Sequence, residues 1–176
     1  KINITFQDIP GQNFLNYKFN NLKFNNTLPL KNHYYLINRY LKHPIYKYEF
    51  FNLRTKDSDL LLIMRKCFKG KAFTYRVIDV IGDINLLFQH SYTILDLFFS
   101  KGAEYVDIYF KSNGFDYESK YSGFIDITSR EDIIFPGYFE PFVFSNPRLN
   151  YAFKRLNSIN LNENFYKGDC DADRPS

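Results

Sequence analysis

Several residue types that would assign this chain to a protein class at once are scarce. Its 176 residues contain no Trp, one Met and two Cys. Cys67 and Cys170 stand far apart, with no CxxC pair and no His at zinc-ligand spacing, so neither a metal site nor a disulfide framework is predicted. Unpaired cysteines are typical of a reducing compartment, and we therefore expect a cytoplasmic protein.

Long apolar segments are also lacking. The run at residues 60–64 is far shorter than the roughly 20 residues that span a bilayer. No signal-peptide pattern opens the chain, so the sequence predicts a soluble protein without a membrane span. The chain starts at Lys1 rather than Met, from which we expect a fragment of a longer protein with a preceding domain.

A strong excess of one charge is absent. Lys and Arg number 23 against 19 Asp and Glu, a formal net charge of +4, and the basic residues are spread among acidic ones. Such a distribution favours a solvated surface over a nucleic-acid partner. The alternation Tyr46, Lys47, Tyr48 could stack bases, but it equally fits a half-buried strand.

Aromatic residues are abundant, with 20 Phe and 15 Tyr. In the absence of Trp, much of the buried area should come from these rings. A chain of this length matches one ordinary domain with a continuous core, so residues 1–176 are expected to form a single domain.

Hydrophobic patterning predicts alternating helices and strands in the first half of the chain. Alternation indicates strands, a period near 3.6 indicates helices, and Pro44 ends the second helix. The expected elements are a strand at residues 1–6, helical segments at 11–22 and 30–43, and an antiparallel meander at 46–54, 59–67 and 72–81.

The second half begins with the clearest helical pattern, at residues 84–100, with Asp83 as its expected cap. Residues 103–110 directly follow this helix and read as a parallel or central strand. Weaker patterns predict short helices at residues 114–123 and 148–156, and strands at 124–127, 138–144 and 164–167.

These elements predict an α/β chain of the α+β kind, with a mixed, mostly antiparallel sheet flanked by helices. Arg76 and Asp79 lie three apart in the third meander strand, so they should point to opposite faces, and one of them should be exposed.

The order of a strand, two helices, three antiparallel strands, a long helix and another strand resembles the GNAT acyltransferase family over nearly the whole chain. Residues 39–83 and 167–175 also resemble acyltransferase-like proteins of bacterial surface-polysaccharide biosynthesis. The resemblance implies a GNAT-like N-acyltransferase, or half of a two-domain version. Its substrate would be an amino sugar or nucleotide sugar, and its donor acetyl-CoA or another acyl-CoA.

In that family the fourth strand leads into a glycine-bearing loop that holds the pyrophosphate of the acyl-CoA at a helix N-terminus. The resemblance places Gly82 and Asn85 at this position, next to Asp83. Because the charge of Asp83 would repel a pyrophosphate, a non-catalytic glycan- or partner-binding domain is the alternative.

The catalytic candidates are Tyr138 and Glu140, two apart on one expected strand face. A carboxylate can deprotonate an amine and a phenol can protonate a thiolate leaving group. The same pair on an exposed strand is often inert.

The substrate-binding candidates are acidic, with one basic exception. Asp79 is either a substrate-orienting acid or a rim residue satisfied by backbone groups. Near the C-terminus every second residue is an aspartate, which resembles half of a calcium loop, but the glycine and glutamate of that loop are missing. It is therefore either a solvated tail or a segment that closes over a sugar ligand, with candidates Asp169, Asp171, Asp173 and Arg174.

Overall fold

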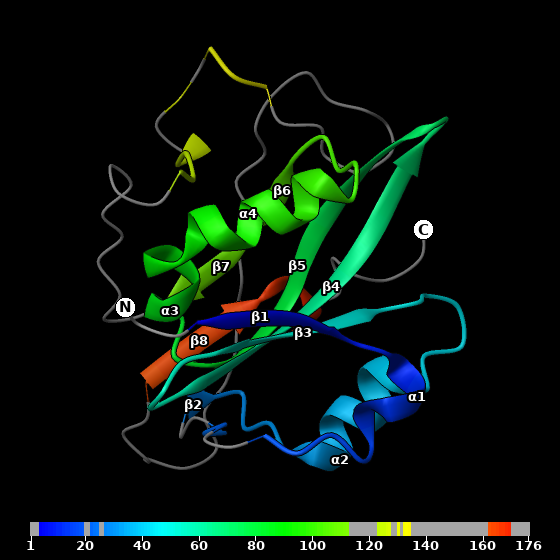
Figure 1. The fold of residues 1–176 in the computed structure, drawn as a ribbon, viewed down its shortest axis with the longest axis vertical. Coiled ribbons are helices and arrows are strands. Elements are labelled where there is room, and N and C mark those ends of the chain that lie inside the picture. Colours follow the sequence, from blue (N-terminus) through cyan, green and yellow to red (C-terminus); the bar gives the residue numbers. More distant parts are fainter. Residues whose placement is uncertain are drawn as a thin grey trace.

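The chain folds into a mixed α+β structure built on a five-stranded, mostly antiparallel sheet (Figure 1). The computed structural model describes residues 4–19, 22–24, 27–112, 123–127, 130, 132–134 and 162–169. The α+β class and the mostly antiparallel sheet predicted from the sequence are confirmed.

The main sheet has the strand order β1-β3-β4-β5-β6. Neighbouring strands are antiparallel, except that β5 and β6 are parallel. The parallel pair follows from a helical crossover between these strands. The predicted meander is confirmed. The strand predicted after the long helix, at residues 103–110, was expected to be parallel or central; it is parallel but lies at the edge of the sheet. The strands are β1 (Thr5–Ile9), β3 (Glu49–Arg54), β4 (Asp59–Lys69), β5 (Ala72–Gly82) and β6 (Val106–Ile108).

Helices lie on both faces of this sheet (Figure 1). One face carries α1 (Gly11–Phe14), α2 (His33–Leu36) and the π-helix η1 (Ile37–Leu41), and the other carries α3 (Asn85–Gln89) and α4 (Ser91–Ser100). The predicted helix at residues 30–43 corresponds to α2 and η1. The predicted helix at 11–22 is shortened to the four residues of α1.

The helix predicted at residues 84–100 is divided at His90, whose φ of −114° and ψ of 19° leave the helical region. Ile84, not Asp83, occupies the N-cap position of α3. The prediction of Asp83 as the cap is therefore wrong by one position. Its carboxylate nevertheless accepts a hydrogen bond from the backbone N–H of Asn85 at 3.0 Å.

Aromatic rings fill the core between the sheet and α4. The ring of Phe98 lies 4.5 Å from that of Tyr75 and 4.9 Å from that of Phe51, measured between centroids. All three side chains are fully buried. Offset and edge-to-face contacts of this kind add to the burial of apolar area, so phenylalanine and tyrosine supply the bulk that tryptophan would otherwise give.

A second, three-stranded sheet has the order β2-β8-β7. It consists of β2 (Thr27–Leu28), β7 (Phe110–Ser112) and β8 (Asn162–Tyr166), and β8 continues into the 3-10 turn η4 (Lys167–Asp169). The predicted final strand is confirmed within one residue at its C-terminal end. Residues 124–127, in contrast, do not form the predicted strand.

A β-bulge in β5 changes the direction of its side chains. Met64 lies opposite Val77, but Ile63 lies opposite Asp79, so Ile78 is an additional residue on β5. The extra residue places Arg76 and Asp79 on the same face, because Asp79 faces Ile63 and Arg76 faces Arg65 across the strands.

The prediction of opposite faces and one exposed side chain is therefore wrong. Arg76 is 1% exposed and Asp79 is 0% exposed. Arg76 is held by Asp107 of β6, to which its Nε donates at 2.9 and 2.8 Å. The buried charge is thus compensated across the parallel strand pair.

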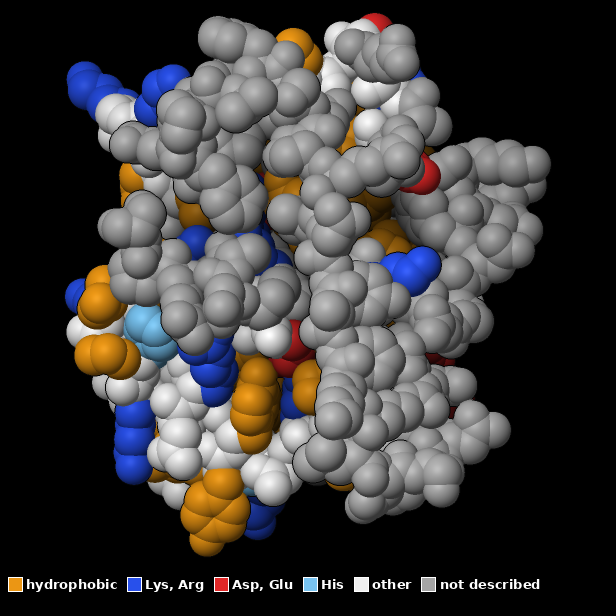
Figure 2. Space-filling view, turned by 180° about the vertical axis from the view of Figure 1, so that it is seen from behind, with side chains coloured by type: hydrophobic (Ala, Val, Ile, Leu, Met, Phe, Trp, Pro, Cys, Tyr) orange, Lys and Arg blue, Asp and Glu red, His pale blue; other side chains and the backbone are white. Residues whose placement is uncertain are grey.

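The strands β5 and β6 are paired only from Tyr75–Val106 to Val77–Ile108. Beyond Val77, the side of β5 that faced β6 meets the segment formed by β8 and η4 instead (Figure 1). On the face of the molecule opposite to that of Figure 1, Lys and Arg side chains are scattered among hydrophobic ones within the described residues (Figure 2).

Candidate functional site

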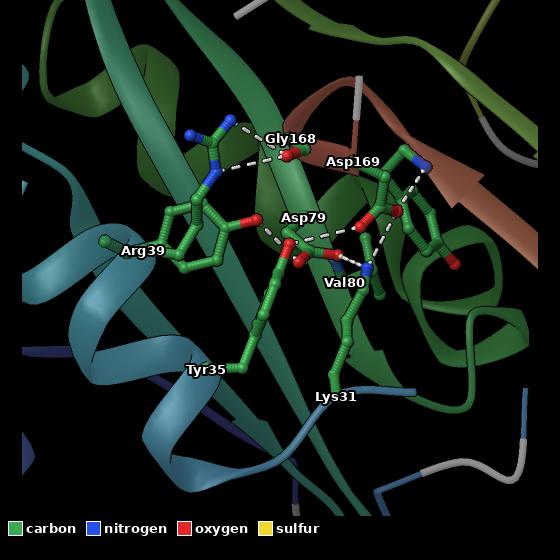
Figure 3. A network of polar contacts seen from close by, with 9 residues as sticks. Lys31, Tyr35, Arg39, Asp79, Val80, Gly168 and Asp169 are labelled. Atoms are coloured by element: carbon green, nitrogen blue, oxygen red, sulfur yellow. Dashed lines mark hydrogen bonds and ion pairs between the residues drawn. The ribbon is translucent and has the colours of Figure 1, made fainter. Parts of the chain in front are cut away.

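Polar side chains from separate parts of the chain converge on Asp79 where β5 leaves its partner β6 (Figure 3). The Nζ of Lys31, just before α2, lies 2.5 Å from Asp79 Oδ1 and 2.9 Å from Asp169 Oδ2. The side chain of Lys31 is only 8% exposed. One buried ammonium therefore joins two carboxylates that are 90 residues apart in the sequence.

The π-helix η1 and the preceding α2 supply the remaining side chains. Tyr40 Oη donates to Asp79 Oδ2 at 2.7 Å, and Tyr35 Oη donates to Asp169 Oδ1 at 3.3 Å. Arg39 Nε and Nη2 donate to the carbonyl oxygen of Gly168 at 3.3 and 3.1 Å. The wider turn of a π-helix often occurs at functional sites, and here it carries both Arg39 and Tyr40.

Backbone donors complete the environment of both acids. The N–H of Val80 donates to Asp79 Oδ1 at 2.8 Å. The N–H of Tyr166 donates to Asp169 Oδ2 at 2.9 Å. Each buried carboxylate thus has an ammonium, a hydroxyl and an amide as partners, which offsets the free-energy cost of removing its charge from water.

The surroundings of Asp79 shift the pKa of its carboxyl upward, toward neutral pH. Burial raises the pKa of Asp79 to about 6, and the negative charge of Asp169 adds to this rise, although Lys31 and Tyr40 oppose it. For Lys31, burial alone would lower the pKa. The charges of Asp79 and Asp169 outweigh that effect and raise it, so Lys31 remains protonated.

A small pocket borders the cluster, with space for about one water molecule. Lys31 forms part of its wall, and the residues of β8 form another part. The lining residues are Phe24, Pro29, Lys31, Val80, Ile81, Asn164 and Tyr166.

The junction after β5 does not fit the pyrophosphate of an acyl-CoA. Gly82 has a φ of +107°, and a Cβ there would stand 2.6 Å from the carbonyl oxygen of Asp59, so this glycine permits close backbone approach within the sheet. The carboxylate of Asp83 accepts from the backbone N–H of Asn85 at 3.0 Å and from its side-chain amide at 2.7 Å. A negative oxygen therefore already uses the donors that an anion would need.

The structure brings together only some of the residues predicted from the sequence. Asp79 and Asp169, both predicted to bind substrate, meet at Lys31. Of the residues predicted to bind the cofactor, Gly82 lies close to the backbone of Asp59, and Asn85 donates to the carboxylate of Asp83. The other candidates lie outside the described residues: Tyr138, Glu140, Asp171, Asp173 and Arg174.

Lys31, Arg39 and Tyr40 were not found by sequence reasoning. Tyr40 fits the apolar period of the helix, and its hydroxyl gave no separate signal. Lys31 is one of 23 basic residues, and only the tertiary structure shows that it is buried.

Comparisons with protein-family models, curated proteins and solved structures found no match to this chain. Among the described residues, no helix is long and apolar enough to cross a membrane. The same part of the chain contains no group of three or more His, Cys, Asp or Glu side chains arranged to hold a metal ion.

Proposed function

We propose that this chain is a GNAT-like, non-catalytic domain that binds a sugar ligand at the Lys31 cluster. The observation that carries the proposal is the convergence of Asp79 and Asp169 on Lys31, which lines a pocket. Amino sugars and nucleotide sugars of surface-glycan assembly are the ligand class.

The polar groups of the cluster suit hydroxyl groups. Lys31 lies between two acids, Asp79 and Asp169, and Arg39 donates to the carbonyl of Gly168 beside them, so donors and acceptors lie close together. Sugar hydroxyls both donate and accept hydrogen bonds, and such a mixture offers partners for each.

Aromatic rings beside these polar groups support the same ligand class. Phe24 and Tyr166 line the pocket, and the ammonium of Lys31 lies 5.0 Å from the centroid of the Tyr166 ring. Ligand sites commonly combine an apolar wall with a few polar groups that fix orientation. A sugar ring presents both kinds of surface.

The test is calorimetric titration with glucosamine, N-acetylglucosamine and UDP-N-acetylglucosamine. At least one should give saturable heat, and Lys31→Met and Asn164→Ala should each weaken its binding by at least about tenfold, the worth of one good polar contact. Lys101→Met is the matched control, because Lys101 pairs with Asp8 away from the pocket.

Thermal melting of each variant verifies that it is folded. Absence of saturable heat from all three sugars would contradict sugar binding. Equal affinity of Lys31→Met and wild type would remove the cluster from the site.

A second candidate function, an N-acyltransferase acting on an amino sugar, is favoured by one observation. The carboxyl of Asp79 is fully buried, and its pKa is raised to about 6 by that burial. A carboxylate poised near neutral pH can accept the proton of a substrate amine. The order of elements resembles the same family.

Acetyl-CoA distinguishes the two candidates. A ligand that binds only the folded state stabilises it by about 2.7 kcal/mol at a hundredfold excess over Kd, and the melting temperature should then rise by several degrees. A rise with acetyl-CoA supports the transferase. An unchanged melting temperature at millimolar acetyl-CoA eliminates it for this chain.

A further inference from the structure

The part of the chain that forms α1, α2 and η1 contains no acidic residue. Between Asp8 and Glu49, residues 9–48 include five Lys and one Arg but no Asp or Glu. At the average frequency of 19 acids in 176 residues, a stretch of this length would hold about four. The mixture of charges seen over the whole chain is therefore absent from this segment, which we call the basic layer.

Contacts between its elements make the basic layer one surface. The ring of Phe14, at the end of α1, stacks on the imidazole of His33, at the start of α2, with 6.1 Å between centroids. A Cβ at Gly11 would lie 3.5 Å from Leu41 Cδ1, so the start of α1 lies against the end of η1. All three elements cover the same face of the main sheet (Figure 1). Their outward side chains therefore belong to one side of the molecule.

Most lysines of the basic layer are exposed to solvent. Lys31 is the exception, because Asp79 and Asp169 hold it in the cluster described above. The exposed ones form no ion pair with any acid in the described part of the chain, and they are Lys18, Lys23, Lys42 and Lys47. Their positive charges are thus available to a partner outside the molecule.

Large apolar side chains are exposed in the same layer. Tyr34 is 77% exposed, Leu30 and Ile45 are each 63% exposed, and Leu15 is 53% exposed. Figure 2 shows Lys, Arg and hydrophobic side chains together over the lower part of the molecule, the end at which α1 and α2 lie in Figure 1. Single exposed apolar residues are common on proteins, so the informative feature is their combination with lysines in a layer without acids.

The opposite face of the sheet lacks this combination. Tyr92 and Phe99 of α4 are exposed there, but Asp83 and Asp96 are exposed on the same side. A surface whose polar charges are all basic and whose apolar side chains face solvent suits a partner that is both negatively charged and apolar. A bilayer that contains anionic lipid has this chemistry.

The exposed aliphatic side chains favour a lipid surface over a nucleic acid. Nucleic-acid bases stack on aromatic rings, and their phosphates pair with lysines, but neither contact uses Leu15, Leu30 or Ile45. At a membrane surface, by contrast, aliphatic side chains enter the boundary between headgroups and acyl chains, and tyrosine is favoured at the same depth.

We propose that the basic layer docks on the surface of membranes that contain anionic lipid. Its exposed lysines contact the lipid phosphates, and its exposed apolar side chains enter the boundary between headgroups and acyl chains. This inference does not depend on the identity of the ligand at the Lys31 cluster.

Co-sedimentation with two kinds of vesicle tests the docking surface. One kind is phosphatidylcholine alone, and the other contains about one third phosphatidylglycerol. We expect saturable binding of the whole chain to the anionic vesicles only, weakened by added salt because salt screens the lysines. Lys18→Glu with Lys42→Glu should weaken this binding by at least about twentyfold, since each lysine near anionic lipid contributes about fivefold.

The matched control reverses two charges elsewhere. Lys69→Glu with Lys71→Glu changes exposed lysines at the turn between β4 and β5, at the opposite end of the molecule from α1 and α2 (Figure 1). It should weaken binding by less than about threefold, because lysines away from the lipid are screened by salt. Thermal melting verifies that both double variants are folded.

A fluorescent reporter follows insertion directly. The chain has no Trp, so Tyr34→Trp supplies its only indole. The emission of this indole should shift to shorter wavelength when anionic vesicles are added, because the ring leaves water. Tyr92→Trp, at an exposed position of α4 on the opposite face, should show no shift.

Four results would overturn the proposal. They are absence of binding to anionic vesicles, equal binding to both kinds of vesicle, equal losses in the two double variants, and an unshifted emission of Tyr34→Trp. Tighter binding to a single-stranded oligothymidylate than to the vesicles would instead assign the basic layer to a nucleic acid. None of these measurements involves a sugar, so failure here and failure of the proposed function are distinguishable.

Discussion

Asp79 and Lys31 show how a single residue acquires its properties from its surroundings. In the unfolded chain a carboxyl of this kind titrates near pH 4. In the folded chain Asp79 lies between a lysine, a second acid and the hydroxyl of Tyr40, all withdrawn from water. Its charge state is therefore coupled to folding.

We predict that Asp79→Asn changes the pH dependence of stability. Because the folded pKa of Asp79 is raised to about 6, its stabilising contribution is complete below about pH 4 and is lost as the pH rises through 6. The free energy of unfolding of the wild type, relative to Asp79→Asn, should fall by on the order of 2 kcal/mol between pH 4 and pH 7.5. Urea denaturation at a series of pH values measures it.

Asp57→Asn is the control, since Asp57 is exposed in the turn between β3 and β4. Its difference from the wild type should be flat over the same range. A constant difference for Asp79→Asn as well would show that Asp79 titrates alike in the folded and unfolded states.

The short elements α2 and η1 position residues of the Lys31 cluster because they follow one another directly, not because they are long. The helix α2 has four residues, yet with η1 it positions Tyr35, Arg39 and Tyr40. Its first turn is capped by Asn32, whose Oδ1 accepts from the N–H of Tyr35 at 2.9 Å. Short helices depend on such caps and on tertiary packing. A helix of one turn forms too few hydrogen bonds to offset the free-energy cost of its nucleation.

Asn32→Ala should therefore lower the free energy of unfolding by about 1 kcal/mol, because the donor at Tyr35 loses its partner. Asn32→Ser keeps a side-chain acceptor and should stay within about 0.5 kcal/mol of the wild type. Chemical denaturation of the three proteins under one condition provides the comparison. Equal losses in both variants would mean that the cap does not stabilise α2.

The contact between η4 and β5 permits a sharper test. Gly168→Ala places a methyl group against the Ile78 carbonyl and Tyr40, so it should destabilise the fold by about 2 kcal/mol, as in other overpacked sites. Gly11→Ala is the matched control, since its new Cβ would meet only Leu41 Cδ1 at an ordinary 3.5 Å. Thermal unfolding should show the first loss only, and an unaffected Gly168→Ala would place η4 away from β5.

On the scale of the whole molecule, stability comes from aromatic packing between the sheet and α4. Phe98 and Phe99 are adjacent in α4, but Phe98 is fully buried and Phe99 is 48% exposed. The helical period alone separates them. They provide an internal comparison of core and surface at one point in the chain.

Phe98→Ala should reduce the free energy of unfolding by about 3–5 kcal/mol, because it removes a ring from the centre of the core and leaves a cavity. Phe99→Ala should cost less than about 1 kcal/mol. Urea denaturation of both variants measures the difference. Losses of similar size would mean that α4 is rotated from the orientation described here.

Much of the architecture could be predicted from local patterns, because alternation and helical periodicity report which faces are buried. The meander at residues 46–81 and the parallel strand after α4 are confirmed for this reason. Predictions were wrong where one residue alters the period. Ile78 shifts the register of β5, and His90 divides the helix.

The residues of the candidate site also divide into those that the sequence could indicate and those that it could not. Asp79 could be chosen as an acid within an expected strand, and Asp169 as one of the alternating aspartates near the C-terminus, since both patterns are noticeable in the sequence. Their partner Lys31 could not, because a lysine before a helix carries no local sign of burial.

The sequence by itself determined the class of fold, the antiparallel meander and the aromatic character of the core, because these depend on periodicity and composition. The tertiary structure decided the rest. The bulge turned Asp79 toward Tyr40 of η1, and Gly168 closed the edge of β5. Both depend on contacts between residues distant in the chain, and the energy of a buried charge is set by neighbours that only folding brings together.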